Sequence, residues 1–118
     1  MLRASAETSG LQVDLMAVAN PKLDSGIPQG AELLAFADAV TGTDAVAVDR
    51  ARAQLLRASG PGALVQAAAI AANFSMNDRA ANAVGIVLEG MFLRGSEGYR
   101  SALGIDRYPS ARNTLKAG

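Results

Sequence analysis

The sequence contains neither cysteine nor histidine among its 118 residues. The absence of cysteine excludes disulfides and thiolate nucleophiles, and the absence of histidine excludes imidazole bases and the usual zinc ligand sets. Any catalysis by this chain would have to use carboxylates, hydroxyls, Lys, Arg or Tyr. We therefore predict no catalytic residue, no metal site and no cofactor.

The sequence also lacks an excess of charge of one sign, and it lacks long apolar runs. The 11 basic and 11 acidic residues give a formal net charge of zero, which argues against a nucleic-acid or anionic-membrane surface. The longest apolar run is about half of the roughly 18 to 20 residues that a membrane span needs. The first ten residues, MLRASAETSG, lack the apolar region of a signal peptide. We expect a cytoplasmic protein with no nucleic-acid or membrane partner.

Aromatic residues are scarce, at 4% of the chain. Half of the residues are hydrophobic, but many of these are alanines, which bury little area each. The length fits a single domain, which we place at residues 1–118, and the apolar spacing throughout predicts an all-α fold. Because its core would be thin, we expect the chain to form a homo-oligomer, between a dimer and a hexamer.

The longest helical pattern covers residues 63–85, ALVQAAAIAANFSMNDRAANAVG. Its first ten positions are apolar except for Gln66, and a helix that is apolar all round is normally buried on all sides. The Gly-Pro-Gly of residues 60–62 is expected to form a turn before it, and Gly85 is expected to end it in a left-handed conformation. We predict that this helix lies at the centre of a multi-chain helical body.

The other core helices are expected between residues 28 and 104. Either Pro28 or Gln29 would begin a helix that ends at Thr41, and Asp44 or Asp49 would cap the next helix, which ends at Ser59. Residues 20–30 read as a loop, and residues 86–93 as helix or irregular structure because no second strand is available to pair with them. A short helix is expected over residues 96–103, with Ser96 as its cap, and residues 105–118 as a polar tail.

Polar side chains gather on the second half of the helix at residues 63–85, where we place a candidate binding site. Asn73 and Asn77 share a face, and Asp78 beside Arg79 could orient a small ligand or pair with a neighbouring helix. The alternative is structural: these groups would bridge helix ends or meet symmetry mates. The candidate binding residues are Asn73, Asn77, Asp78 and Arg79.

The remaining charged residues show no pairing in the sequence. Glu32, Glu89 and Glu97 are isolated carboxylates, so no acid–base pair can be named. The arginines of residues 50–57 spread round their helix, which is typical of a solvated face rather than of an anion site.

The order of the segments resembles the C-terminal part of the alkylhydroperoxidase D-like, peroxidase-related proteins of the carboxymuconolactone decarboxylase superfamily. The resemblance covers roughly residues 31–115 and depends on packing motifs. The matching positions are Leu34–Phe36 (family LLAFA), Phe74, Asn77, Arg79, Ala80 and Gly85-Ile86 (family FN…R.A…GI), and Leu103-Gly104 with Ser110–Thr114 (family LG…SARNT).

The resemblance implies an all-α homo-oligomeric helical bundle. It also implies antioxidant peroxidase or disulfide-reductase chemistry at a Cys-x-x-Cys motif followed by His, assisted by Glu, and this chain has no Cys or His to receive that role. Residues 1–20 resemble the tail of the motif helix and the helix after it, with Gly10-Leu11 as the turn between them. Either the catalytic segment lies upstream of this start, or the chain is a degenerate member. An in-frame Cys-x-x-Cys-x-x-x-His in the upstream DNA would indicate the first.

We favour a degenerate family member that serves as an oligomeric scaffold or small-molecule binder. The alternative is an antioxidant hydroperoxidase whose catalytic segment lies upstream. A third hypothesis is a decarboxylase or lactonase-like activity that uses Arg79 and a carboxylate, and a fourth is an interaction module unrelated to the family.

Overall fold

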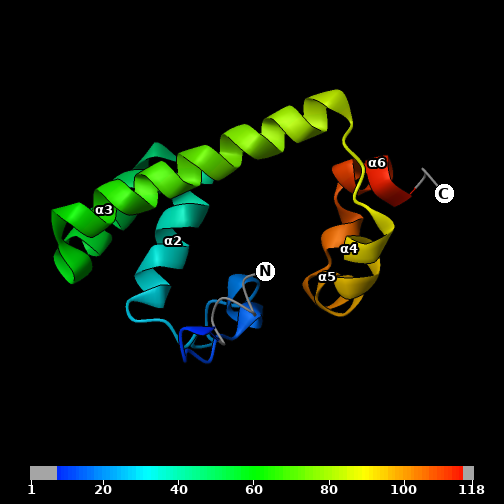
Figure 1. The fold of residues 1–118 in the computed structure, drawn as a ribbon. Helices are drawn as coiled ribbons and strands as arrows, with labels where there is room; N and C mark the ends of the chain where they lie inside the picture. Colours follow the sequence, from blue (N-terminus) through cyan, green and yellow to red (C-terminus); the bar gives the residue numbers. More distant parts are fainter. Residues whose placement is uncertain (1–7, 116–118) are drawn as a thin grey trace. The chain divides into compact units, whose positions relative to one another are not determined.

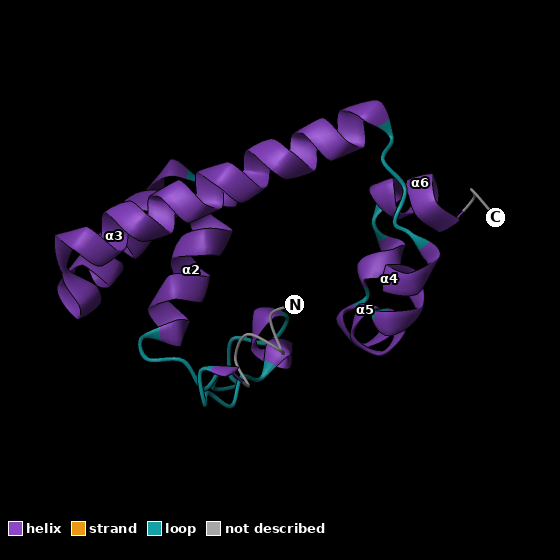
Figure 2. Cartoon of the chain, viewed as in Figure 1, coloured by secondary structure: helices purple, strands orange, loops and turns teal. Residues whose placement is uncertain are grey.

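The computed structural model describes residues 8–115 (Figure 1). Every regular element in this range is a helix and no strand is present there (Figure 2), which confirms the all-α prediction. None of the helices described is both long enough and apolar enough to cross a membrane.

The chain divides by its contacts into two compact units, residues 1–75 (unit 1) and residues 76–118 (unit 2). The placement of one unit against the other is not defined, so each is described separately. The expectation of one domain over residues 1–118 stays a prediction, because this division does not decide whether the two units unfold together.

Residues 9–14 of unit 1 form turns and irregular structure, where the family resemblance implied a helix after the turn at Gly10-Leu11. A single short 3-10 helix, η1 (Leu15–Val18), follows Asp14, whose carboxylate accepts a 2.9 Å hydrogen bond from the Met16 N–H. The predicted loop is confirmed over residues 20–29, and Gly30 is already the first residue of the next helix. The carboxylate of Asp24 accepts from the Gly26 N–H at 2.9 Å, the local turn that Asp residues favour. The expectation for residues 1–7 lies outside the described residues.

Helix α2 (Gly30–Thr41) starts slightly later than its sequence pattern suggests. The reason is Gln29, which adopts a left-handed conformation with φ 53° and cannot continue a right-handed helix. The helix ends as predicted at Gly42, whose N–H donates to the carbonyls of Asp38 and Ala39.

Helix α3 (Ala45–Val84) consists of two helical segments that meet at Gly60, where φ is 79° and ψ is 175°. The predicted turn is confirmed there, since this backbone conformation is open essentially only to glycine. Asp44 is the cap, because its carboxylate accepts from the N–H groups of Val46 and Ala47 at 2.9 and 3.2 Å. Asp49 instead forms a 2.8 Å ion pair with Arg52.

The C-terminal end of α3 also matches its prediction. Gly85 has a φ of 70°, and the Ile86 N–H donates to the Ala81 carbonyl at 3.0 Å. This six-residue hydrogen bond around a left-handed glycine is a Schellman cap, which satisfies a carbonyl that the helix leaves unpaired.

The core of unit 1 joins α2 to both segments of α3. Phe36 from α2 packs with Ala51 and Leu55 from the first segment, and Leu55 is completely buried. Leu64 and Ala67 from the second segment pack against this cluster. The core is therefore small and is shared by three helical segments.

The second segment of α3 turns only part of its surface to this core. Val65, Ile70 and Phe74 are 67%, 59% and 62% exposed within one chain. The described part of unit 1 therefore leaves these three side chains open, and the covering of this helix by other copies stays a prediction.

Unit 2 continues with two short helices, α4 (Gly90–Gly95) and α5 (Glu97–Leu103), and α5 ends at left-handed Gly104. Ser96 stands at the N-cap position of α5 as expected, but its side chain makes no capping hydrogen bond. Its helical backbone continues from α4, and its hydroxyl donates to the Leu93 carbonyl at 3.2 Å. The expected polar tail also carries structure, in η2 (Ile105–Arg107), η3 (Pro109–Ala111) and α6 (Arg112–Leu115).

Arg100 is the polar centre of unit 2, and its side chain is only 11% exposed. Its Nε donates to the Ser96 hydroxyl at 2.9 Å, its Nη2 donates to the Leu93 carbonyl at 3.1 Å, and its Nη1 pairs with the carboxylate of Asp106. These bonds join α4, α5 and η2. A second tie runs from the Leu88 N–H to the Thr114 hydroxyl at 2.8 Å.

Replacing Arg100 with Lys is expected to lower the free energy of unfolding by about 1–3 kcal/mol, because one ammonium group cannot reach three acceptors placed round a planar guanidinium. Arg107→Lys is the matched control, since Arg107 is exposed and its side chain bonds to no described residue. Urea unfolding followed by circular dichroism measures both. Equal midpoints for the two variants would contradict the role given to Arg100.

Candidate functional site

The four residues predicted to form a binding site lie on successive turns of α3. Asn73, Asn77, Asp78 and Arg79 are all exposed, and none of their side chains forms a hydrogen bond or ion pair with another described residue. They lie near one another only because they are close in sequence on the same helix.

Arg79 in particular has no carboxylate partner in the part of the chain that is described, where ion pairs form at Arg52 and Arg100. The hypothesis of a decarboxylase or lactonase that uses Arg79 with a carboxylate therefore gains no support from the geometry. Acidic side chains also do not converge elsewhere, since residues 8–115 contain no group of three or more that would suit a metal ion.

One groove brings together charged residues that the sequence did not pair. It has a volume of about 450 Å³ and lies between α2 and the first segment of α3, with Glu32, Gln54 and Arg57 as its polar lining. The rest of its lining is alanine. Glu32 is half-buried, whereas Gln54 and Arg57 are exposed. Sequence reasoning missed this juxtaposition because the two charges are 25 positions apart on different helices.

A second pocket, of about 370 Å³, lies between the N-terminal turns of unit 1 and α2, and its character is apolar. Its walls come from residues 9–18, from the loop at residues 25–27 and from the first turns of α2. Its large apolar lining residues are Leu11, Val13, Leu15, Val18, Ile27, Leu33 and Leu34.

The wall of this apolar pocket is held by short-range constraints. The Asp14 N–H donates to the Ser25 carbonyl at 3.0 Å, which ties the loop to the N-terminal turns. A Cβ on Gly26 would lie 1.9 Å from the Gln12 carbonyl oxygen, and one on Gly30 would lie 1.9 Å from the Ser25 hydroxyl oxygen. Glycine at both positions therefore allows the two chain segments to meet.

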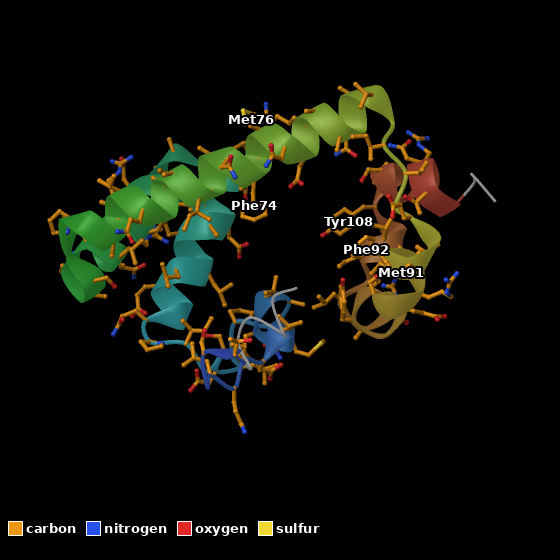
Figure 3. All side chains as sticks on the ribbon, in the orientation of Figure 1. Phe74, Met76, Met91, Phe92 and Tyr108 are labelled. Atoms are coloured by element: carbon orange, nitrogen blue, oxygen red, sulfur yellow. The ribbon has the colours of Figure 1, made fainter. Side chains whose placement is uncertain are left out.

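Unit 2 carries a large apolar surface. Ten of its large apolar side chains are exposed, while among residues 76–114 no apolar side chain is buried and Ser96 is the one buried residue. Figure 3 labels several of these side chains, and Phe92 and Tyr108 extend from the same edge of the unit in that view. The ten are Met76, Val84, Ile86, Val87, Leu88, Met91, Phe92, Tyr99, Ile105 and Tyr108.

Comparisons of the chain with protein-family models, with curated proteins and with solved structures found no match. The resemblance to alkylhydroperoxidase D-like proteins therefore stays a prediction from sequence motifs.

Proposed function

We propose that this chain is a degenerate alkylhydroperoxidase D-like protein that acts as an oligomeric scaffold, assembled from copies of itself and lacking a redox centre of its own. The absence of Cys and His from the sequence supports the second half of this proposal, because the family's chemistry needs both. The apolar surface of unit 2 supports the first half, which is the assembly of copies of the chain into an oligomer.

The exposed apolar area on unit 2 is of the size that a specific interface requires. The exposed fractions of the ten side chains run from 37% for Ile105 to 74% for Val84. An aromatic side chain alone contributes about 150–250 Å² when it is buried. Ten side chains that are half exposed therefore present an area similar to the ~800 Å² that each partner buries in a standard interface.

Another copy of the chain is the partner that this surface favours. The net charge of zero means that copies do not repel each other through their overall charge. Large exposed apolar patches are rare on soluble monomers and mark interaction sites. Self-association would also give unit 2 the apolar core that it does not form within one chain.

Phe92→Asp tests this proposal by placing a charge within the apolar surface. Phe92 is 52% exposed in the free chain, so the variant is expected to fold, while self-association weakens by about 2 kcal/mol or more, roughly thirty-fold in the dissociation constant. Ser110→Asp adds the same charge at an exposed polar position of unit 2 and serves as the control. Light scattering after size-exclusion chromatography, over a concentration series, measures the mass.

The wild type and Ser110→Asp are expected at a multiple of the 12.0 kDa chain mass, and Phe92→Asp is expected to shift toward 12.0 kDa. A wild type that stays at 12.0 kDa at every concentration would overturn the scaffold. In the same preparation, a peroxide-consumption assay with a thiol reductant is expected to match the protein-free blank. Clear turnover would show that the chain has chemistry of its own.

A further inference from the structure

We propose that the apolar pocket of unit 1, between residues 9–18, the loop at residues 25–27 and α2, binds a small uncharged apolar molecule. This inference does not depend on the scaffold function, because every lining residue of the pocket belongs to unit 1.

The polar groups at this pocket are already engaged by the chain itself. The Asp14 carboxylate accepts from the Met16 N–H at 2.9 Å, and the buried Ser25 hydroxyl accepts from the Ile27 N–H at 3.3 Å. A ligand that needs strong hydrogen bonds or an opposite charge would have to displace these turns. The remaining lining offers Leu, Val and Ile side chains, with which only apolar groups pair favourably.

Charge complementarity narrows the ligand further. Among the described residues of the lining, Asp14 is the one that carries a charge, so an anion would meet a negative charge at the wall. A cation would gain little, because the carboxylate is exposed to water and already caps η1. An uncharged ligand is not repelled by the carboxylate of Asp14, whereas a fatty-acid-like anion is.

The pocket is also built before any ligand arrives. The hydrogen bond from Asp14 to Ser25 and the close approach at Gly26 fix the loop against the N-terminal turns, and the close approach at Gly30 holds the start of α2 against the loop. Preorganisation of this kind reduces the ordering cost of binding. The volume of about 370 Å³ falls in the range of small-molecule sites and suits on the order of ten non-hydrogen atoms, at about 30 Å³ for each water-sized group.

A fluorescence titration of the full-length protein with 1-aminonaphthalene, a small apolar dye that is uncharged at neutral pH, tests this proposal. We expect saturable binding of one dye per chain, displaced by octanol at a concentration at least ten-fold lower than by octanoate. The two competitors share a chain length and differ in charge, so the ratio of their potencies measures how strongly the pocket discriminates against a negatively charged ligand.

Leu34→Glu and Leu56→Glu form a matched pair of variants. Both replace a partly exposed helical leucine of unit 1, but only Leu34 lines the pocket. Leu34→Glu is expected to weaken dye binding at least ten-fold, and Leu56→Glu to change it less than two-fold. Circular dichroism of both variants checks that the helices are intact.

Three results would overturn the pocket assignment: no saturable binding to the wild type, equal loss in the two variants, or equal potency of octanol and octanoate. If the dye binds more weakly as the protein concentration rises, a second copy of the chain occupies the pocket in place of a small molecule. That result would also overturn the assignment. Phe92→Asp separates this inference from the scaffold, because that variant is expected to lose self-association while it binds the dye as the wild type does.

Discussion

Replacing Leu55 with Ala is expected to lower the free energy of unfolding by about 2–5 kcal/mol. Leu55 has no exposed surface and packs with Phe36 and Ala51 at the centre of unit 1. Truncation would remove its buried methyl groups and leave a cavity between α2 and α3. Because the buried hydrophobic residues of the described chain are so few, neighbouring side chains have little capacity to refill that space.

Leu56→Ala provides the matched control for this experiment. Leu56 follows Leu55 on the same helical segment but is 43% exposed, so the same chemical change should cost well under 1 kcal/mol. Chemical unfolding of both variants at one protein concentration gives the comparison. Similar losses for the two would mean that the core of unit 1 lies elsewhere than at the cluster of Phe36, Ala51 and Leu55.

The second large effect is expected at Gly26, where Gly26→Ala should destabilise unit 1 by about 2–5 kcal/mol. One part of the cost, about 1–2 kcal/mol, comes from a φ of 75°, which L side chains rarely adopt. The other part comes from the new Cβ, placed 1.9 Å from the Gln12 carbonyl oxygen, which forces the backbone apart and costs about 1–3 kcal/mol.

Gly10→Ala separates these two contributions. Gly10 has a φ of 68°, close to that of Gly26, but no atom lies within 4 Å of the position of its Cβ. Its substitution should therefore show the conformational cost without the clash. Thermal and urea unfolding of the two variants measures the difference, and dye binding should be lost in Gly26→Ala but kept in Gly10→Ala. Equal destabilisation would contradict the close approach that shapes the pocket wall.

The sequence was most informative where local chemistry decides the backbone. Asp44 as a cap, Gly60 as a break and Gly85 as a terminator all follow from short-range rules, and the structure confirms each. Ser96 shows the limit of those rules. Its residue type suits a cap, but its hydroxyl bonds to Leu93 and Arg100 because α4 and α5 meet there.

The candidate sites were less predictable because they depend on contacts between elements. The polar cluster from Asn73 to Arg79 was visible as a sequence pattern, yet no other described element meets it. The groove with Glu32 and Arg57 joins two helices, and the apolar pocket joins the N-terminal turns to α2. Neither was proposed from the sequence, since single-residue spacing does not report which helix faces pack together.

The turn at Gly60 has a consequence for how unit 1 folds. The residues of the core cluster around Leu55 all lie between Leu33 and Ala67, so their contacts close short loops through neighbouring helices. Short loops lose little chain entropy on closure, and helical domains with such local topology fold on the microsecond-to-millisecond scale. Unit 1 is therefore expected to reach its native contacts rapidly after synthesis, before the slower, concentration-dependent encounter of one copy with another.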